Sequence, residues 1–258
     1  FVHDMQTGVT ERVSVDSVGA QANGNSDQPS ISTDGRYVAF KSQATNLVPG
    51  DTNAREDVFV HDMQTGTTTR VSIDSSGAQG NAESYVPSIS ANGRYTAFGS
   101  VATNLVPGDN NGTDDIFVRD MQTGTTERVS VDSSGAQADN FSYSASISAD
   151  GRYVAFYSYA TNLVSGDTNG QSDIFVRDMQ TGTTARVSVD SSGVEANNSS
   201  YSPSISGDGR YVVFHSFDGN LVPGDTNGQF DIFVHDMQTG MTERVSVDSS
   251  GAQANGSS

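Results

Sequence analysis

The sequence contains no cysteine, so neither a disulfide framework nor a thiolate metal site is available. It also lacks any apolar run that approaches the length needed to span a membrane. Lysine is almost absent, since Lys41 is the only one, and the formal net charge is −18. Such an acidic surface repels phosphates and anionic headgroups, which argues against nucleic acid and membranes as partners. The scarcity of lysine beside abundant Asn, Asp, Ser, Thr and Gly favours an exported protein.

One segment recurs at a fixed distance along the chain. The sequence Phe-Val-(His/Arg)-Asp-Met-Gln-Thr-Gly begins at Phe1, Phe59, Phe117, Phe175 and Phe233, so the period is 58 residues. A fixed period of this length indicates one small structural element repeated in tandem. The period divides the chain into an outer hairpin, 1–26, and four repeats at 27–84, 85–142, 143–200 and 201–258.

Each repeat is predicted to hold four strands and no helix. Asp34-Gly35 is a tight-turn signal between two of them. The segments 152–156 and 174–176 are apolar on both faces and must be covered on both, whereas 186–189 alternates like an outer strand with one wet face. Small sheets covered on both faces stack face to face. The sequence therefore predicts an all-β fold, a β-propeller or an open propeller-like array of four-stranded antiparallel blades; a β-helix, the structural rival, has much shorter coils.

The copies of the two halves of the repeat are unequal in number. The (Asp/Asn)-Gly-Arg-Tyr element occurs four times, at Arg36, Arg94, Arg152 and Arg210, one time fewer than the Phe-Val element. Residues 1–26 thus supply an outer hairpin without its two inner strands, and a bare strand edge promotes aggregation. We expect a longer array, or an assembly in which another chain supplies the missing strands; an unusual ring closure is the third option.

A resemblance supports the predicted fold. The segment Ser146-Ile-Ser-Ala-Asp-Gly-Arg-Tyr-Val-Ala-Phe156 and its sister copies, followed by Asp173-Ile-Phe-Val-Arg-Asp178, resemble the TolB-like, WD-type propeller repeat of bacteria. The resemblance covers nearly the whole chain. It implies blades with a short inner strand, an Asp-Gly turn and two central strands. Such propellers serve as interaction platforms, periplasmic scaffolds and enzyme appendages, so we expect an extracellular or periplasmic bacterial protein.

The loop before the third strand of each repeat is the best candidate for a metal site. Asp, Asn and Asp stand at its first, third and seventh places, a spacing that lets a short loop wrap a Ca²⁺ ion. It resembles the acidic loops of dockerins, thrombospondin repeats and integrin propellers, although no bidentate Glu closes it. Asx-turns that cap backbone groups are the alternative explanation. The predicted ligands are Asp51, Asn53, Asp57, Asp109, Asn111, Asp115, Asp167, Asn169, Asp173, Asp225, Asn227 and Asp231.

Positions at which the copies differ suggest a second candidate site. Several become aromatic near blade ends, where rings form a recognition surface for a protein or stack on sugar rings. Packing of each ring against a neighbouring loop is the alternative. The predicted binding surface comprises Tyr85, Tyr143, Tyr157, Tyr159, Tyr201 and Phe217.

Other repeated polar residues have structural explanations. The aspartate before each Met-Gln-Thr-Gly turn, such as Asp62, is expected to accept turn N–H groups. Arginines such as Arg70 are expected to form surface ion pairs that contribute little. His61 occupies a place that Arg119 and Arg177 fill in other copies, so that place cannot be a required general base.

No catalytic constellation stands out from the repeated background, because no Ser/His/Asp set, phosphate cradle or paired-carboxylate motif is evident. We therefore predict a non-catalytic structural or interaction protein, an exported array that self-assembles through its incomplete blade. Its partner would be another copy of itself, another protein or a glycan. The alternative is a calcium-assisted, lectin-like module that binds glycan or protein, and an accessory domain of an enzyme is a third possibility.

Overall fold

The structure, a computed structural model, describes residues 1–257, which form strands and turns. Within that range there is no helix, and thus no helical stretch with the length and hydropathy to cross a bilayer. The contacts divide the chain into two compact units. The first unit comprises Phe1–Gly112 and Phe117–Glu127, and the second comprises Thr113–Ile116 and Arg128–Ser258.

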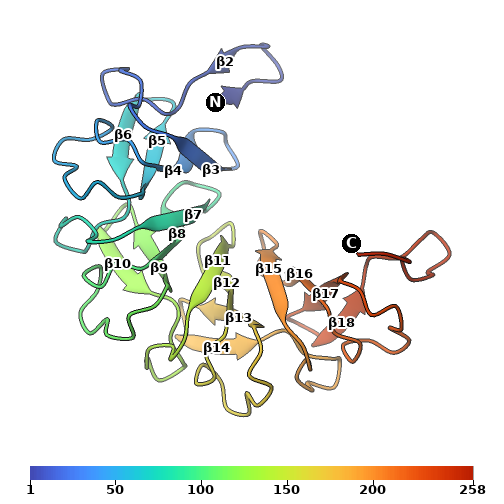
Figure 1. The fold of residues 1–258 in the computed structure, drawn as a ribbon. Helices are drawn as coiled ribbons and strands as arrows, with labels where there is room; N and C mark the ends of the chain where they lie inside the picture. Colours follow the sequence, from blue (N-terminus) through green and yellow to red (C-terminus); the bar gives the residue numbers. More distant parts are fainter. Residues whose placement is uncertain (258) are drawn as a thin grey trace. The chain divides into compact units, whose positions relative to one another are not determined.

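Four antiparallel sheets of four strands follow the predicted repeat, and in each the strands are neighbours in chain order (Figure 1). A separate two-stranded hairpin, β1 (Val2–His3) and β2 (Thr10–Glu11), precedes them. The first blade is β3 (Ser26–Ile31), β4 (Tyr37–Ser42), β5 (Asp57–Asp62) and β6 (Thr67–Arg70), and the second is β7 (Ser84–Ile89), β8 (Tyr95–Ser100), β9 (Asp115–Asp120) and β10 (Thr125–Arg128). The third blade is β11 (Ser142–Ile147), β12 (Tyr153–Ser158), β13 (Asp173–Asp178) and β14 (Thr183–Arg186), and the fourth is β15 (Ser200–Ile205), β16 (Tyr211–Ser216), β17 (Asp231–Asp236) and β18 (Met241–Arg244).

The inner strand of every blade carries a bulge. In β11 the pairing with β12 shifts register between Tyr143 and Ser146. The residue after Tyr143 is Ser144, whose φ of 55° lies in the left-handed region. Gln28, Val86 and Ser202 repeat this conformation. A bulge increases the local twist of a strand and changes the direction of its side chains. Every copy therefore has one strained residue, which orients the side chains at that end of the inner strand.

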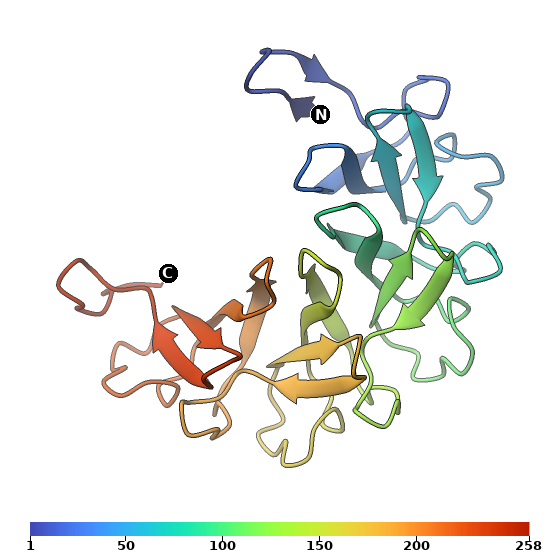
Figure 2. The ribbon, with the colours of Figure 1, turned by 180° about the vertical axis from the view of Figure 1, so that it is seen from behind.

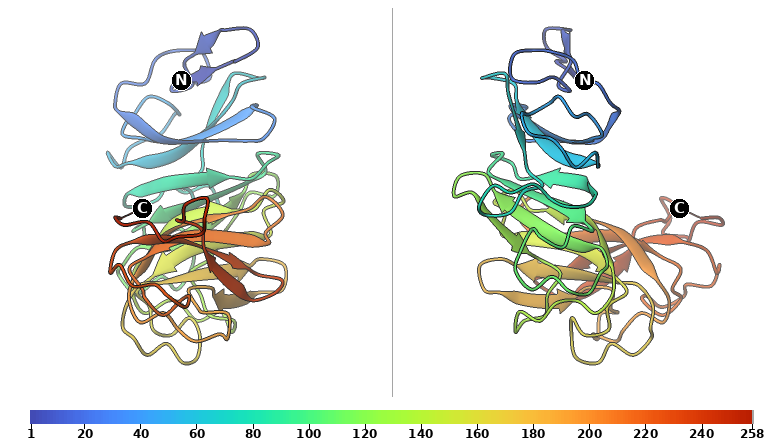
Figure 3. Two further views of the ribbon diagram at one scale, coloured as in Figure 1. Left: turned by 90° about the vertical axis from the view of Figure 1, so that its right-hand side faces the viewer. Right: turned by 60° about the vertical axis from the view of Figure 1, so that its left-hand side comes forward.

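The core lies between neighbouring blades of each unit. In the first unit, β7 packs across β3 and β4, and in the second, β15 packs across β11 and β12 (Figures 2 and 3). The third strands β5 and β9 are buried along their whole length and β13 at all but one residue, whereas β17 alternates between buried and half-buried residues. This confirms the prediction that the central strands are covered on both faces.

One strand prediction was wrong in its bounds. The outer strand expected at 186–189 is β14 and ends at Arg186, and Val187 and Ser188 beyond it are buried. The Ser188 hydroxyl donates to Asp173 Oδ1 at 2.5 Å and accepts the Ile174 N–H at 3.1 Å. The Ser188 side chain thus takes the place of a backbone acceptor for the Ile174 N–H, and the β13–β14 ladder ends there. The alternation of apolar residues in the sequence does not indicate this.

Candidate functional site

The predicted metal-binding loops bring their oxygen atoms together. In the first blade, Asn53 Nδ2 donates to Asp57 Oδ2 at 3.2 Å and to the Gly80 carbonyl at 3.0 Å. Asn53 Oδ1 accepts the Arg55 N–H at 2.9 Å, which is the Asx-turn expected as the alternative. The same contacts recur around Asn169 and Asn227. The second loop is divided, since Asp109 and Asn111 belong to the first unit and Asp115 to the second.

An arginine and a glutamine from later in the chain accompany these carboxylates. Arg70, with 6% of its side chain exposed, lies 3.7 Å from Asp51 Oδ2 and 3.8 Å from Asp57 Oδ2. Gln79 Nε2 donates to Asp51 Oδ1 at 2.9 Å and to Asp57 Oδ2 at 3.1 Å. The expectation that Arg70 forms a surface ion pair was therefore wrong. Its counterparts Arg128, Arg186 and Arg244 are also largely buried against the loop carboxylates.

The third blade differs because Glu195 stands where the other copies have glutamine. One oxygen each of Asp167, Asp173 and Glu195 lie within 4.8 Å of one another, an arrangement that could hold a metal ion. Arg186 Nη1 lies 3.8, 3.3 and 2.5 Å from these carboxylates, in that order. Burial raises the pKa of Asp167 and of Asp173 to about 6, because desolvation penalises the charged form.

Aromatic side chains form a continuous cluster in the second unit. The Tyr143 ring stacks on Tyr157 at 5.7 Å, and Tyr157 meets Tyr201 edge to face at 5.4 Å. The Tyr159 and Tyr201 hydroxyls lie 2.8 Å apart, and burial raises the pKa of Tyr159 to about 12. Phe217 is 45% exposed. The second-unit aromatic cluster is Phe141, Tyr143, Tyr157, Tyr159, Tyr201, His215, Phe217 and Phe230.

The predicted binding surface is therefore only partly continuous. Five of its six residues lie in the second-unit aromatic cluster, whereas Tyr85 belongs to the first unit. There the Tyr85 ring lies over Gly99, where a Cβ would meet its ring carbon at 2.8 Å. In the first blade the equivalent strand ends are charged, and Lys41 Nζ lies 3.0 Å from Glu56 and 3.4 Å from Asp27.

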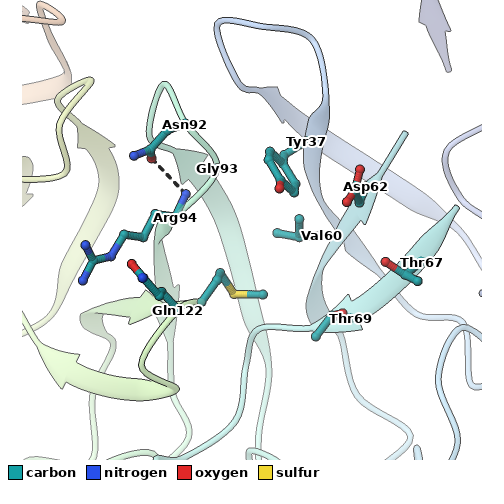
Figure 4. A pocket seen from close by; sticks show the side chains of 10 residues that line it. Tyr37, Val60, Asp62, Thr67, Thr69, Asn92, Gly93, Arg94 and Gln122 are labelled. Atoms are coloured by element: carbon teal, nitrogen blue, oxygen red, sulfur yellow. Dashed lines mark hydrogen bonds between the residues drawn. The ribbon is translucent and has the colours of Figure 1, made fainter. Parts of the chain in front are cut away.

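A groove separates the two blades of the first unit (Figure 4). It has a volume of about 380 Å³. The Tyr37 ring faces Gly93 across it, so close that a Cβ on Gly93 would lie 2.1 Å from the ring. Behind Tyr37, the Arg36 guanidinium lies 4.7 Å from the ring centroid and forms a bidentate pair with Asp62 at 2.9 and 2.7 Å.

A larger groove lies between the hairpin β1–β2 and the first blade, with a volume of about 640 Å³. Gly35 is the counterpart of Gly93 and has no atom within 4 Å of the position of a Cβ. Ile31 at the groove is 50% exposed, whereas its counterpart Ile89 is 7% exposed. Several residues that line this groove, such as Asp4, Gly35 and Met63, are counterparts of residues that line its neighbour, but no tyrosine in the described part of the chain covers its glycine.

Solved structures of known proteins share this architecture. TolB from Acinetobacter baumannii superimposes with a TM-score of 0.52 at 18% identity over 89% of this chain, and putative TolB from Agrobacterium tumefaciens with 0.56 at 18% over 89%. The chain has a TolB-like β-propeller fold. The tricorn protease also matches, with a TM-score of 0.57 at 15% identity over 94% of this chain.

The matched structures extend beyond this TolB-like propeller array. The chain spans 45% of Acinetobacter TolB, 67% of Agrobacterium TolB and 24% of the tricorn protease. Identities this low establish the fold alone. No family model matches the chain, and no curated protein matches its sequence.

The turn aspartates of the TolB-like blades accept turn N–H groups as predicted, and the place shared by histidine and arginine has a hydrogen-bonding role that was not predicted. Asp62 Oδ1 accepts the Gln64 N–H at 2.9 Å, and the Arg36 guanidinium holds the pKa of Asp62 well below its usual range. His61 Nδ1 lies 2.9 Å from Thr68 Oγ1. Arg119 Nη1 makes the equivalent bond to Thr126 at 3.0 Å, so histidine and arginine fill one structural place.

Three residues at these sites were not predicted from the sequence, although each differs from its counterparts in the other copies. Phe141 and Phe230 stand where the first blade has Asn25 and Glu56. Glu195 likewise replaces a glutamine found in the other copies. Each is a departure from a near-identical background, and such departures are the only sequence signal that marks a local site in a repeat protein.

Proposed function

We propose that this TolB-like array is a non-catalytic, exported interaction protein, extracellular or periplasmic, that assembles with further copies of its own repeat through the hairpin β1–β2. Nucleic acid and membranes are not its partners, given the net charge of −18. The observation that carries the proposal is the groove beside the hairpin, where the equivalents of Arg36 and Tyr37 are missing from the described residues.

The groove lacks two side chains that every complete blade supplies. The Asp4 carboxylate accepts the backbone N–H groups of Gln6 and Thr7 at 2.7 and 3.2 Å, and no arginine among residues 1–257 forms an ion pair with it. Its counterparts Asp62, Asp120, Asp178 and Asp236 each pair with an arginine. The open space over Gly35 corresponds to the place of a tyrosine.

A strand pair that carries Arg-Tyr after its Asp-Gly turn would complete this surface. Its arginine would reach Asp4, its tyrosine would cover Gly35, and its backbone would add to β1 as an extra strand. Each of the four Arg-Tyr strand pairs of this chain already completes a blade, so the donor we propose is another copy of the repeat that gives up its own inner strands in a head-to-tail exchange. A heterologous interface of this kind builds a ring or a filament.

The test is binding of a fluorescent peptide that spans residues 26–42, which contain Arg36 and Tyr37. We expect saturable binding by fluorescence anisotropy, weakened at least tenfold when the protein carries Asp4→Asn or the peptide carries Tyr37→Gly. Light scattering should show mass that rises with protein concentration. A monomer at every concentration that also ignores the peptide would refute the proposal.

The second-unit aromatic cluster supports a second candidate function, calcium-assisted binding of a glycan or protein in the manner of a lectin. Contiguous, partly exposed rings offer faces on which sugar rings stack, and the loop of Asp167 and Asp173 in the same unit supplies oxygen ligands for Ca²⁺. A glycan array with and without chelator tests this idea. Binding that disappears in Tyr201→Ala supports it, and a blank array under both conditions excludes glycans.

A further inference from the structure

The four loop sites contain the same two aspartates and the same arginine, and one neighbouring residue distinguishes them. In the first blade, the Gln79 amide donates to both Asp51 and Asp57. In the fourth, Gln253 Nε2 donates to Asp225 Oδ1 at 2.6 Å and to Asp231 Oδ2 at 2.9 Å. The amide N–H groups therefore satisfy carboxylate oxygens that are removed from water.

Glu195 cannot make this bridge because a carboxylate has no N–H to donate. It accepts the Thr168 hydroxyl at 2.9 Å and the Thr168 N–H at 3.1 Å instead. Asp167 Oδ1, the atom that corresponds to Asp51 Oδ1, is buried without a hydrogen-bond partner among the described residues. The Asp167 side chain is only 2% exposed, so this oxygen is removed from bulk water.

The charge at this place is also unbalanced. Arg186 supplies one positive charge to three carboxylates that all lie within 3.8 Å of its Nη1. A buried carboxylate needs a counter-charge or a hydrogen-bond donor, because desolvation of an unpaired ion costs several kcal/mol. Arg186 alone leaves two of the three carboxylate charges uncompensated. It also leaves Asp167 Oδ1 without a hydrogen-bond partner within residues 1–257.

We infer that the third blade binds one divalent cation with a preference for oxygen ligands, such as Ca²⁺, at Asp167, Asp173 and Glu195. A divalent ion supplies the two missing charges, and its ligand shell accepts the unpartnered Asp167 oxygen. The three loops with glutamine lack the third carboxylate and bind no ion. The inference does not depend on glycan binding or on self-assembly, since the metal is its only ligand.

The experiment is calorimetric titration of Ca²⁺ into EDTA-treated protein, with Glu195→Gln as the matched variant. This substitution installs the residue that the other copies already have, so the fold is retained. We expect one ion per chain in the original protein and at least a tenfold weaker affinity in Glu195→Gln. Equal binding by both proteins, or no binding by either, would overturn the inference.

The reciprocal variant is Gln79→Glu, which gives the first blade the same three carboxylates and arginine. We expect the stoichiometry to rise to two ions per chain, with a further increase in melting temperature on adding Ca²⁺. A melting temperature that responds to pH but not to Ca²⁺ in all three proteins would show that a proton, and not a metal, neutralises the cluster.

Discussion

The first and second units share one backbone repeat but differ in chemistry where the first two strands of a blade meet. In the first blade this place holds the ion cluster of Asp27, Lys41 and Glu56. In the third blade the counterparts of Asp27 and Lys41 are Tyr143 and Tyr157, whose rings stack at 5.7 Å. The strands at both places have the same register.

The difference separates the residues that specify the fold from those available for recognition. Side chains between the blades are nearly the same in every copy and carry the packing. Side chains at the strand ends pair with each other across the sheet, so either an ion pair or a ring pair is compatible with the same backbone. A propeller can therefore change its partner at the strand ends without changing its core.

The largest expected effect comes from truncating a buried phenylalanine of the core that both units contain. Phe175 is fully buried with its ring 5.9 Å from Phe156, and Phe59 has the same relation to Phe40 at 6.0 Å. We expect Phe175→Ala and Phe59→Ala each to lower the free energy of unfolding by about 3–5 kcal/mol in urea titrations. Phe217→Ala, at an exposed ring, is the control and should cost less than about 1 kcal/mol. Similar losses in all three would contradict the division between core and strand ends.

The aromatic and the charged strand ends are expected to differ in their contribution to stability. Tyr201 contacts Tyr157, His215 and Phe230 and shares a hydrogen bond with Tyr159. We expect Tyr201→Ala to cost about 2 kcal/mol of unfolding free energy, since apolar area and ring contacts are lost together.

The matched variant in the first unit is Lys41→Ala, which removes a partly solvated ion cluster and should cost less than about 1 kcal/mol. Calorimetric unfolding of both variants gives the comparison. A larger loss for Lys41→Ala would mean that the ion cluster, and not the aromatic cluster, is the better-packed end.

The sequence was sufficient for the fold, because period and alternation are properties of every copy. Apolar residues on both faces of 174–176 required cover on both sides, and β13 is buried as expected. The sites were harder to predict, because they depend on partners distant in sequence. Nothing near Asp51 indicates that Arg70 and Gln79 will lie against it, and the loop spacing alone suggested calcium ligands.

A third, smaller effect distinguishes blades within each unit, at the position shared by histidine and arginine. Burial lowers the pKa of His61, because desolvation disfavours the charged imidazole. The unfolded chain therefore binds a proton more readily than the folded one, and stability falls as the pH drops below about 6.5. Arg119 and Arg177 fill the same place without titrating in this range.

The corresponding variant is His61→Arg, which should reduce the loss of melting temperature between pH 7 and pH 5. Burial also lowers the pKa of His235, so we expect His235→Arg to have the same effect. An unchanged pH profile in the double variant His61→Arg/His235→Arg would show that other groups determine the acid side of the stability curve.

The smallest expected effect is at two strained backbone positions of the first unit. Ala54 has a φ of 54°, where the other copies have Gly112, Gly170 and Gly228 at 68°, 64° and 60°. A side chain disfavours the left-handed region, so Ala54→Gly should raise the free energy of unfolding by about 0.5–1 kcal/mol, despite the greater entropy of glycine in the unfolded chain. Val86, at the inner-strand bulge with a φ of 47°, is β-branched where the second unit has serine, so Val86→Ser should add a similar amount. If both substitutions instead destabilise the protein in urea titrations, these side chains make contacts worth more than the strain, and the first unit is not simply a strained copy of the second.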